Sequence, residues 1–167
     1  MANCGYAGEI LWVDLTSGET ERRATSDYAD RFLGGRGLAA KIYWDEVPPD
    51  VGALEPENRL IFATGPLGGV PMIGGSRWTI CGKSAAMETF SYCNLGGRWG
   101  AELKFAGFDA IVTYGKSNKP VYLLIDGDKV ALKDASGIWG SGAINTREAL
   151  KAEHGKSARV VAIGPAG

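Results

Sequence analysis

Two glycine-rich stretches of the sequence carry the side chains best suited to binding a ligand. The first, "GGSRW" (Gly74–Trp78), places Arg77 directly before an apolar run that is typical of a strand. The second, "NLGGRWG" (Asn94–Gly100), places an asparagine, backbone amides and an arginine before a short amphipathic segment. Backbone amides at a helix start, together with a guanidinium group, form an anion site suited to phosphate. The alternative is that both stretches are glycine turns with surface arginines, and the residues alone leave both interpretations open.

The stretch Gly35–Ala40 matches the pattern G-x-G-x-x-A, a variant of the dinucleotide-binding fingerprint. That fingerprint requires a strand before it, a helix after it and an acidic residue about 20 positions further on. A helix is expected before this stretch instead. The pattern therefore favours a turn between two helices over a dinucleotide site.

Few other side chains could take part in catalysis. His154 is the single histidine, and it lies near the end of a predicted helix, where we expect it to be solvated or to face the helix dipole. Glu102 and Asp109 are conceivable acid–base groups, but a lone carboxylate is more often a surface charge. We therefore assign no catalytic residue.

The three cysteines, Cys4, Cys81 and Cys93, are odd in number and form no C-x-x-C pair. This spacing predicts neither a disulfide framework nor a zinc or iron–sulfur site within the chain. Buried or unpaired thiols are the expected state. With one histidine and no paired cysteines, a transition metal held by protein ligands is not expected either.

Composition narrows the class of protein. The 167 residues include 18 basic and 19 acidic side chains, so no net positive field exists to hold nucleic acid or an acidic membrane. Hydrophobic residues make up 45% of the chain, yet no apolar run reaches the roughly 18 residues of a transmembrane helix. The first residues, "MANCGYAGEI", lack the features of a signal peptide, and we expect a cytoplasmic location.

The apolar pattern predicts short strands and helices that do not alternate strictly. Asp126-Gly127-Asp128 is the predicted turn of a hairpin, Ser26 and Asp27 are predicted to cap one helix, and Asn145 with Glu148 forms a capping-box-like start for another. Strands often follow strands, which favours an α+β domain with antiparallel or mixed sheets over a doubly wound fold. The predicted strands are 9–15, 19–25, 59–65, 77–83, 109–115, 120–126, 129–135 and 158–164, and the predicted helices are 26–32, 38–47, 98–106 and 145–155.

Taken together, the motifs resemble a known family. The sequence contains, in order, "GYAGEILWVDLTSGETE", "FLGGRGLAAKIYWDEVPP", "PENRLIFATGPL", "GGSRWTICGKS", "NLGGRWGAELKFAGFDAIV", "GKSNKPVYLLI", "DASGIWG" and "ARVVAIGPAG". This order is similar to that of the N-terminal domain of tungsten-dependent aldehyde ferredoxin oxidoreductases, and the resemblance spans Gly5 to Gly167.

The resemblance implies an α+β fold with two sheets related by a pseudo-twofold axis. It also implies a seat for tungstopterin, a bis-pterin cofactor that carries tungsten or sometimes molybdenum. The implied reaction converts a small aldehyde and water to a carboxylic acid. Two electrons pass through a [4Fe–4S] cluster, expected only in later domains, to ferredoxin or an electron-transfer subunit. A homo-oligomer is left open, and no nucleic-acid or membrane partner is expected.

The resemblance also assigns roles to residues. The family's phosphate-contacting arginine before a strand matches Arg77, and its Asn-x-Gly cofactor loop matches Asn94, Leu95 and Gly96. The main-chain carbonyl of Asn94 is implied to hold a magnesium ion that bridges the two pterin phosphates. Two stretches depart from the family pattern: residues 84–88 read Ser-Ala-Ala-Met-Glu, where Ser-Pro-Leu-Thr-Gly is common, and residues 98 and 99 are Arg and Trp, where two aromatic residues are usual.

Two hypotheses follow for the chain as a whole. In the first, residues 1–167 are an N-terminal pterin-cofactor-binding domain, incomplete at its C-terminal end and lacking the catalytic and cluster domains. In the second, the chain is a non-catalytic pterin-binding or subunit-assembly module.

Overall fold

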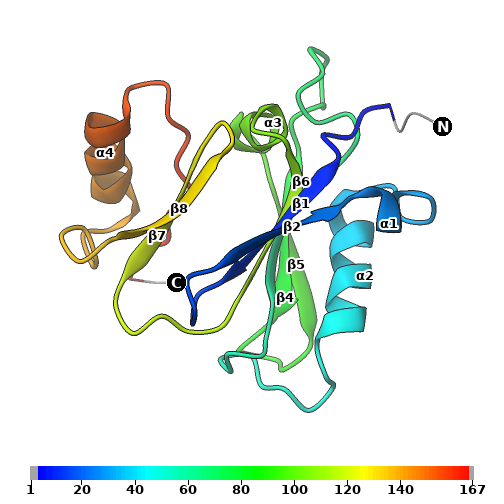
Figure 1. Cartoon of the computed structure of the whole chain (residues 1–167), viewed down its shortest axis with the longest axis horizontal. Helices are drawn as coiled ribbons and strands as arrows, with labels where there is room; N and C mark the ends of the chain where they lie inside the picture. Colours follow the sequence, from blue (N-terminus) through cyan, green and yellow to red (C-terminus); the bar gives the residue numbers. More distant parts are fainter. Residues whose placement is uncertain (1–3, 166–167) are drawn as a thin grey trace. The chain divides into compact units, whose positions relative to one another are not determined.

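The computed structural model describes residues 4–165, which form two compact units. The first unit ends at Ser117 and the second begins at Asn118. The described residues contain eight strands and four helices, so the predicted α+β class is confirmed (Figure 1). The pseudo-twofold relation between the sheets stays a prediction, and the expected continuation at Gly167 lies outside the described residues.

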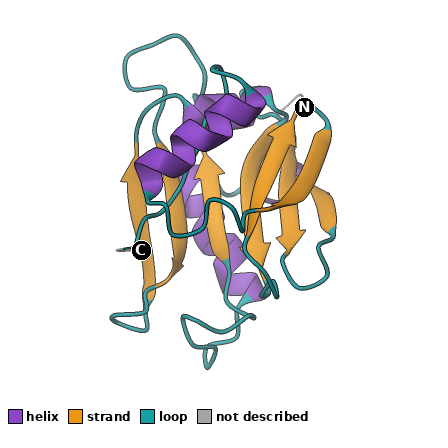
Figure 2. Ribbon diagram, turned by 90° about the vertical axis from the view of Figure 1, so that its left-hand side faces the viewer, coloured by secondary structure: helices purple, strands orange, loops and turns teal. Residues whose placement is uncertain are grey.

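The first unit is built on a six-stranded mixed sheet with the order β2-β1-β6-β3-β4-β5. Only the β1–β6 pair is parallel, and the other neighbours are antiparallel. Loops and turns, teal in Figure 2, lie at the ends of the strands. The elements are β1 (Glu9–Asp14), β2 (Thr20–Ala24), α1 (Ser26–Ala29), α2 (Gly35–Glu46), β3 (Leu60–Thr64), β4 (Trp78–Lys83), β5 (Phe90–Leu95), α3 (Trp99–Phe105) and β6 (Phe108–Tyr114).

Helix α2 covers one face of this sheet, as Figure 1 shows. Successive side chains of a strand point to opposite faces, so alternate apolar residues of β1, β3, β4 and β6 reach the helix. The helix contributes the buried residues Leu38, Ala39 and Ile42. The strands contribute Ile10, Trp12, Ile61, Ala63, Cys81, Ala110 and Val112.

Strand β5 was not among the predicted strands, and its residues were assigned to a turn. Its sequence FSYCNL shows no regular alternation of buried and exposed positions, because β5 lies at the edge of the sheet and none of its residues is fully buried. Periodicity reports burial on one face, so an exposed edge strand gives a weak signal. The outer edge of β5 has no strand partner among the described residues.

The predicted helix caps were wrong. Helix α1 is a single turn whose N-cap is Thr25, and neither Ser26 nor Asp27 caps it, because no side chain caps this helix. Helix α4 (Ala143–His154) begins two residues before Asn145, after Gly142 with φ 79°. Asn145 donates from Nδ2 to the Ser141 carbonyl instead. Glycine reaches positive φ without steric cost, so the turn before α4 ends earlier than the side chains indicated.

The second unit consists of an antiparallel hairpin and α4. Strands β7 (Val121–Asp126) and β8 (Lys129–Asp134) flank a turn in which Gly127 has φ 56°, as the predicted hairpin requires. The predicted strand 158–164 was wrong: these residues pair with no strand in the described part of the chain. An apolar run forms a strand only where a hydrogen-bonding neighbour is present.

The three cysteines differ sharply in environment. Cys81 is buried beneath α2, whereas Cys4 and Cys93 are exposed. Burial raises the pKa of the Cys81 thiol to about 11, with a smaller contribution from Cys93. The thiolate is the nucleophile, so a raised pKa and burial both slow alkylation.

We expect iodoacetamide at pH 8 to label Cys4 and Cys93 rapidly in the folded protein and Cys81 only after denaturation, as peptide mass spectrometry would show. Rapid labelling of Cys81 in the native state would contradict its burial.

Candidate functional site

The antiparallel pairing of β4 and β5 brings the two predicted loops together. Trp78 pairs with Leu95 and Thr79 pairs with Asn94. Arg77 immediately precedes the paired part of β4, and Gly96 immediately follows the paired part of β5. Arg77 and Asn94 are 17 residues apart in the sequence, and this pairing places both at the same end of one hairpin.

Arg77 is exposed, and its guanidinium group has no hydrogen-bond or ion-pair partner within residues 4–165. The second arginine of the site behaves differently. Arg98 lies 3.3 Å from the carboxylate of Glu102, one helical turn away. Arg77 is therefore the guanidinium that is free to pair with an external anion, and Glu102 has the structural role of partner to Arg98.

The loop that follows β5 leaves backbone donors unused. Gly97 has φ 81°, a conformation that favours glycine. In the described part of the chain, the amides of Gly97 and Arg98 donate to no backbone carbonyl. Because β5 is an edge strand, alternate main-chain carbonyls also face away from β4. The loop thus offers both kinds of backbone group that a phosphate and its cation require.

Trp78 holds the loop from beneath. Its indole Nε1 donates to the Gly96 carbonyl at 3.1 Å. The ring is 3% exposed and packs against Trp99, with 4.3 Å between ring centres, and against Phe62 at 6.3 Å. Helix α3 comes this close because Gly100 has no side chain: a Cβ there would lie 2.9 Å from the Cβ of Trp78.

Thr79 holds the asparagine of the loop. Its hydroxyl donates to Oδ1 of Asn94 at 3.0 Å, and the threonine itself is buried. Trp78 and Thr79 were not among the predicted site residues. Both appear in the sequence as ordinary members of a strand, and only the pairing with β5 shows what they contact.

The start of α2 lies beside the same strands. A Cβ on Gly35 would be 3.8 Å from the Thr79 hydroxyl oxygen, and the guanidinium of Arg36 lies 4.3 Å from the ring centre of Tyr92 on β5. Gly34 must be glycine, since its φ is 140° and a Cβ would lie 2.8 Å from the Thr64 carbonyl oxygen. A helix, α1, precedes this stretch, as predicted. The predicted turn was wrong, however, because Gly35–Ala40 form the first six residues of α2.

The other candidate groups have structural roles. Asp109 is fully buried and is held by backbone amides, Thr25 and Lys104 rather than exposed to a substrate. His154 lies in the last turn of α4, and its Nε2 is 2.9 Å from the Tyr122 hydroxyl. It is therefore partly buried against β7 rather than solvated, and its place in the last turn of α4 agrees with the other expectation, that it faces the helix dipole. In residues 4–165, no three His, Cys, Asp or Glu side chains gather as metal ligands would.

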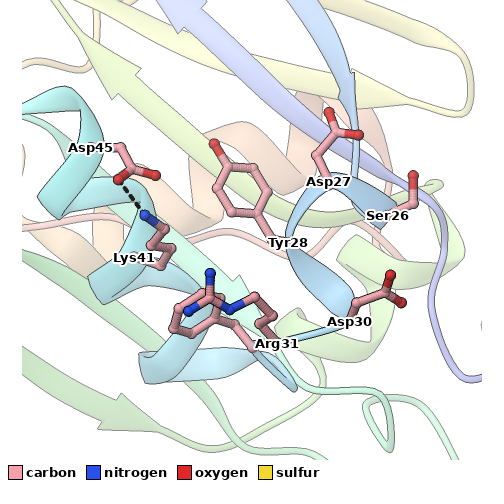
Figure 3. A pocket seen from close by; sticks show the side chains of 8 residues that line it. Ser26, Asp27, Tyr28, Asp30, Arg31, Lys41 and Asp45 are labelled. Atoms are coloured by element: carbon pink, nitrogen blue, oxygen red, sulfur yellow. Dashed lines mark hydrogen bonds and ion pairs between the residues drawn. The ribbon is translucent and has the colours of Figure 1, made fainter.

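A surface hollow of about 440 Å³ lies between α1, the residues that follow it and the C-terminal half of α2 (Figure 3). Its lining includes three carboxylates, and one of these, Asp45, already pairs with Lys41 at 2.5 Å. The hollow contains no residue of the β4–β5 site. Its excess of carboxylates makes it a poor site for phosphate.

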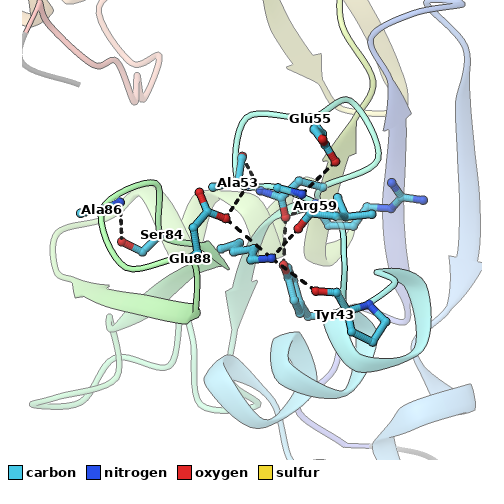
Figure 4. A network of polar contacts seen from close by, with 12 residues as sticks. Tyr43, Ala53, Glu55, Arg59, Ser84, Ala86 and Glu88 are labelled. Carbon is cyan, nitrogen blue, oxygen red and sulfur yellow. Dashed lines mark hydrogen bonds and ion pairs between the residues drawn. The ribbon is translucent and has the colours of Figure 1, made fainter.

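A polar network fixes the opposite end of the β4–β5 hairpin (Figure 4). Lys83 donates to the Val51 carbonyl at 2.5 Å and lies 3.7 Å from Glu88, while Tyr43 donates to Asn58 at 3.1 Å. Residues 84–89 form the turn here, so the departure from the family pattern at residues 84–88 lies at the far end of the hairpin from Arg77.

Comparison with known proteins matches this arrangement to one family. The family described as "Aldehyde ferredoxin oxidoreductase, N-terminal domain" matches residues 10–167. The chain belongs to this family. It is 44% identical over 165 residues to the tungsten-containing aldehyde ferredoxin oxidoreductase of Pyrococcus abyssi, an alignment that covers 98% of this chain and 27% of the relative. The resemblance seen in the sequence motifs is thereby confirmed.

Two further proteins similar to this chain carry different names. The chain is 38% identical to the aliphatic sulfonate oxidoreductase WOR-like subunit of Pyrococcus furiosus, over 89% of this chain and 24% of that protein. A solved structure, the active-site complex BamBC of benzoyl coenzyme A reductase with 1,5-dienoyl-CoA, matches with a TM-score of 0.87 and 46% identity. That match covers 90% of this chain and 23% of the other. The chain thus spans about a quarter of the length of its relatives.

No described helix has both the length and the apolar character needed to cross a membrane.

Proposed function

We propose that this chain is the cofactor-seating N-terminal part of a tungsten bis-pterin oxidoreductase. Residues 1–167 would form the pterin-cofactor-binding domain, with the catalytic and cluster domains in further sequence. The observation that carries the proposal is the convergence of the free Arg77 guanidinium with the Asn94–Gly96 loop at one end of the β4–β5 hairpin. The tungsten-containing relatives support the choice of cofactor.

The residues of the site fit the phosphate groups of such a cofactor. Arg77 would pair with a phosphate, and Asn94, Leu95 and Gly96 would present main-chain groups to it. The Asn94 carbonyl would bind Mg²⁺, which prefers oxygen ligands. When bound, tungstopterin supplies the two-electron redox chemistry. The chain's own contribution is to bind and orient the phosphate end of the cofactor.

We propose oxidation of an aldehyde to a carboxylic acid as the reaction of the whole protein, with ferredoxin or an electron-transfer subunit as acceptor and a [4Fe–4S] cluster in the remaining sequence. The named aldehyde ferredoxin oxidoreductase relatives support this choice. Reduction of an aromatic acyl-coenzyme A is a second candidate, because one chain of the benzoyl coenzyme A reductase complex is 46% identical to this chain over the part that matches. A bis-pterin with molybdenum, a homo-oligomer and a cytoplasmic location stay predictions.

The alternative proposal is a non-catalytic pterin-binding or assembly module. The mass of the polypeptide from its native source separates the two proposals. A mass several-fold above 17.6 kDa supports the oxidoreductase, whereas a mass of 17.6 kDa supports the module.

Replacing Arg77 by alanine tests the site. We expect cofactor affinity to fall by about 10- to 150-fold, since a charge-assisted hydrogen bond contributes roughly 1.5–3 kcal/mol. The measurement is tungsten and pterin per polypeptide in the purified full-length protein. Arg147→Ala is the matched control, because Arg147 is an exposed arginine of α4 and loses the same charge. Equal tungsten content in the two variants would count against the site.

A further inference from the structure

Two neighbouring residues of β4 hold the Asn94–Gly96 loop from opposite faces of the sheet. Trp78 and Thr79 are consecutive, so their side chains point to opposite faces. Each nevertheless contacts the loop: Trp78 through the Gly96 carbonyl and Thr79 through the Asn94 side chain. The loop is thus fastened at both ends by side chains that do not themselves reach solvent, since both residues are buried.

The contact from Thr79 determines which way the Asn94 carboxamide faces. A carboxamide has an acceptor oxygen and a donor NH₂ group on opposite sides. Its oxygen accepts from the Thr79 hydroxyl at 3.0 Å. The NH₂ group donates to no residue within the described part of the chain. Because Oδ1 is occupied by Thr79 and Asn94 is exposed, the two N–H donors remain available to an anion.

The contact from Trp78 determines the path of the backbone beyond Asn94. The indole ring is held by Trp99 and Phe62 and by the close approach of Gly100, so it forms a fixed donor. The Gly96 carbonyl accepts that donor and therefore points inward. The next amides, those of Gly97 and Arg98, are left without a backbone acceptor in residues 4–165. Backbone amides that are oriented before binding lower the ordering cost of capturing an anion.

We propose that Thr79 and Trp78 are positioning residues for a phosphate group: Thr79 aims the Asn94 carboxamide N–H donors at it, and Trp78 orients the Gly97 and Arg98 amides. This inference rests on the proposed function, because it concerns the same cofactor loop. It adds the Asn94 side chain as a phosphate donor, beside the main-chain contacts already proposed.

Three variants of the full-length protein test the proposal, with tungsten and pterin per polypeptide as the readout after dialysis. Thr79→Val keeps the size and branching of the side chain but removes the hydroxyl. Thr79→Ser restores the hydroxyl and removes a methyl group. Trp78→Phe keeps an aromatic ring and removes the N–H donor. Thermal melting of the apoprotein accompanies each measurement, so that loss of binding can be separated from loss of folding.

We expect Thr79→Val and Trp78→Phe each to weaken cofactor retention by about fivefold, as the loss of one neutral hydrogen bond implies. Thr79→Ser is expected to remain within about twofold of the parent protein. Rescue by serine is the decisive result, because serine packs less well than valine but supplies the hydroxyl. If valine retained the cofactor better than serine, Thr79 would have only a packing role and the inference would be overturned.

Arg77→Ala separates this inference from the function on which it rests. If Arg77→Ala lowers tungsten content and Thr79→Val and Trp78→Phe do not, the positioning roles are wrong and the site stands. If none of the three changes tungsten content, the site assignment fails and the inference fails with it. If Thr79→Val does not fold, two other results still support the proposal. Thr79→Ser would keep the tungsten content of the parent protein, and Trp78→Phe would retain the cofactor about fivefold less well.

Discussion

Replacing Asp109 by alanine is expected to lower the free energy of unfolding by about 3–5 kcal/mol, because it leaves a buried charge without its partner. Asp109 is 1% exposed and accepts hydrogen bonds from the amides of Ala7 and Gly8 and from the Thr25 hydroxyl. Its fourth contact is Lys104, at 2.9 Å. The alanine variant would retain the Lys104 ammonium group in the interior, together with two unpaired amides.

Urea denaturation followed by circular dichroism measures this effect. Glu9→Ala is the matched control: Glu9 pairs with Arg22 at 2.9 Å, but both side chains are more than a third exposed, and such pairs contribute only about 0–1 kcal/mol. A second variant, Asp109→Ala with Lys104→Met, is expected to recover part of the lost stability, since the charge is removed with its partner. A loss below about 1 kcal/mol for Asp109→Ala would show that the network is dispensable.

The same aspartate shows what sequence reasoning could not reach. From the sequence it was a conceivable acid–base group, with a surface charge as the more common alternative, yet it is buried. Its partners are Ala7 and Gly8, about a hundred residues earlier, and Lys104 in the preceding helix. The amides of Ala7 and Gly8 reach Asp109 because β1 and β6 lie side by side. This pairing is parallel and therefore requires a long connection between the two strands.

Seven of the eight strands were predicted, including β2, β7 and β8, none of which contains a buried residue, whereas β5 was not predicted. Runs such as 59–65 and 109–115 became β3 and β6, whose side chains form the core under α2. Strand β2 is an equally exposed edge strand, but it follows the turn residues Thr16-Ser17-Gly18, whereas residues 84–89 before β5 contain neither glycine nor proline. The run 158–164 was predicted as a strand because it is apolar, yet apolar character does not supply a neighbour with which to pair.

The residues of the candidate site could be selected from the sequence, but the contacts that support them could not, and their role in binding stays a prediction. Arg77 and the Asn94–Gly96 loop were identified from residue type and from the family resemblance. That the two belong to one hairpin end depended on β5, which the sequence did not indicate. Trp78 and Thr79 could be assigned a role only once the register was known, because their contacts cross between strands.

Truncating Trp78 to alanine is expected to lower the free energy of unfolding by about 3–5 kcal/mol, the usual cost of removing a large buried aromatic side chain. The ring is 3% exposed and fills the space between Phe62, Trp99 and Gly100. Helix α3 packs on this ring, so the cavity would lie directly beneath the Asn94–Gly96 loop. Denaturation followed by circular dichroism is the measurement, because removal of a tryptophan would confuse a fluorescence signal.

Trp44→Ala is the matched control, since Trp44 lies on α2 with 83% of its surface exposed. Its truncation is expected to change stability by no more than about 0.5 kcal/mol. If both variants lost the same stability, the ring cluster under the loop would not be a packed core.

The comparison of Trp78→Ala with Trp78→Phe separates the two roles of the Trp78 side chain. Phenylalanine keeps most of the buried ring and should keep most of the stability, yet it cannot donate to the Gly96 carbonyl. A variant that folds like the parent protein but retains less cofactor would assign the indole N–H to the site and the ring to the fold.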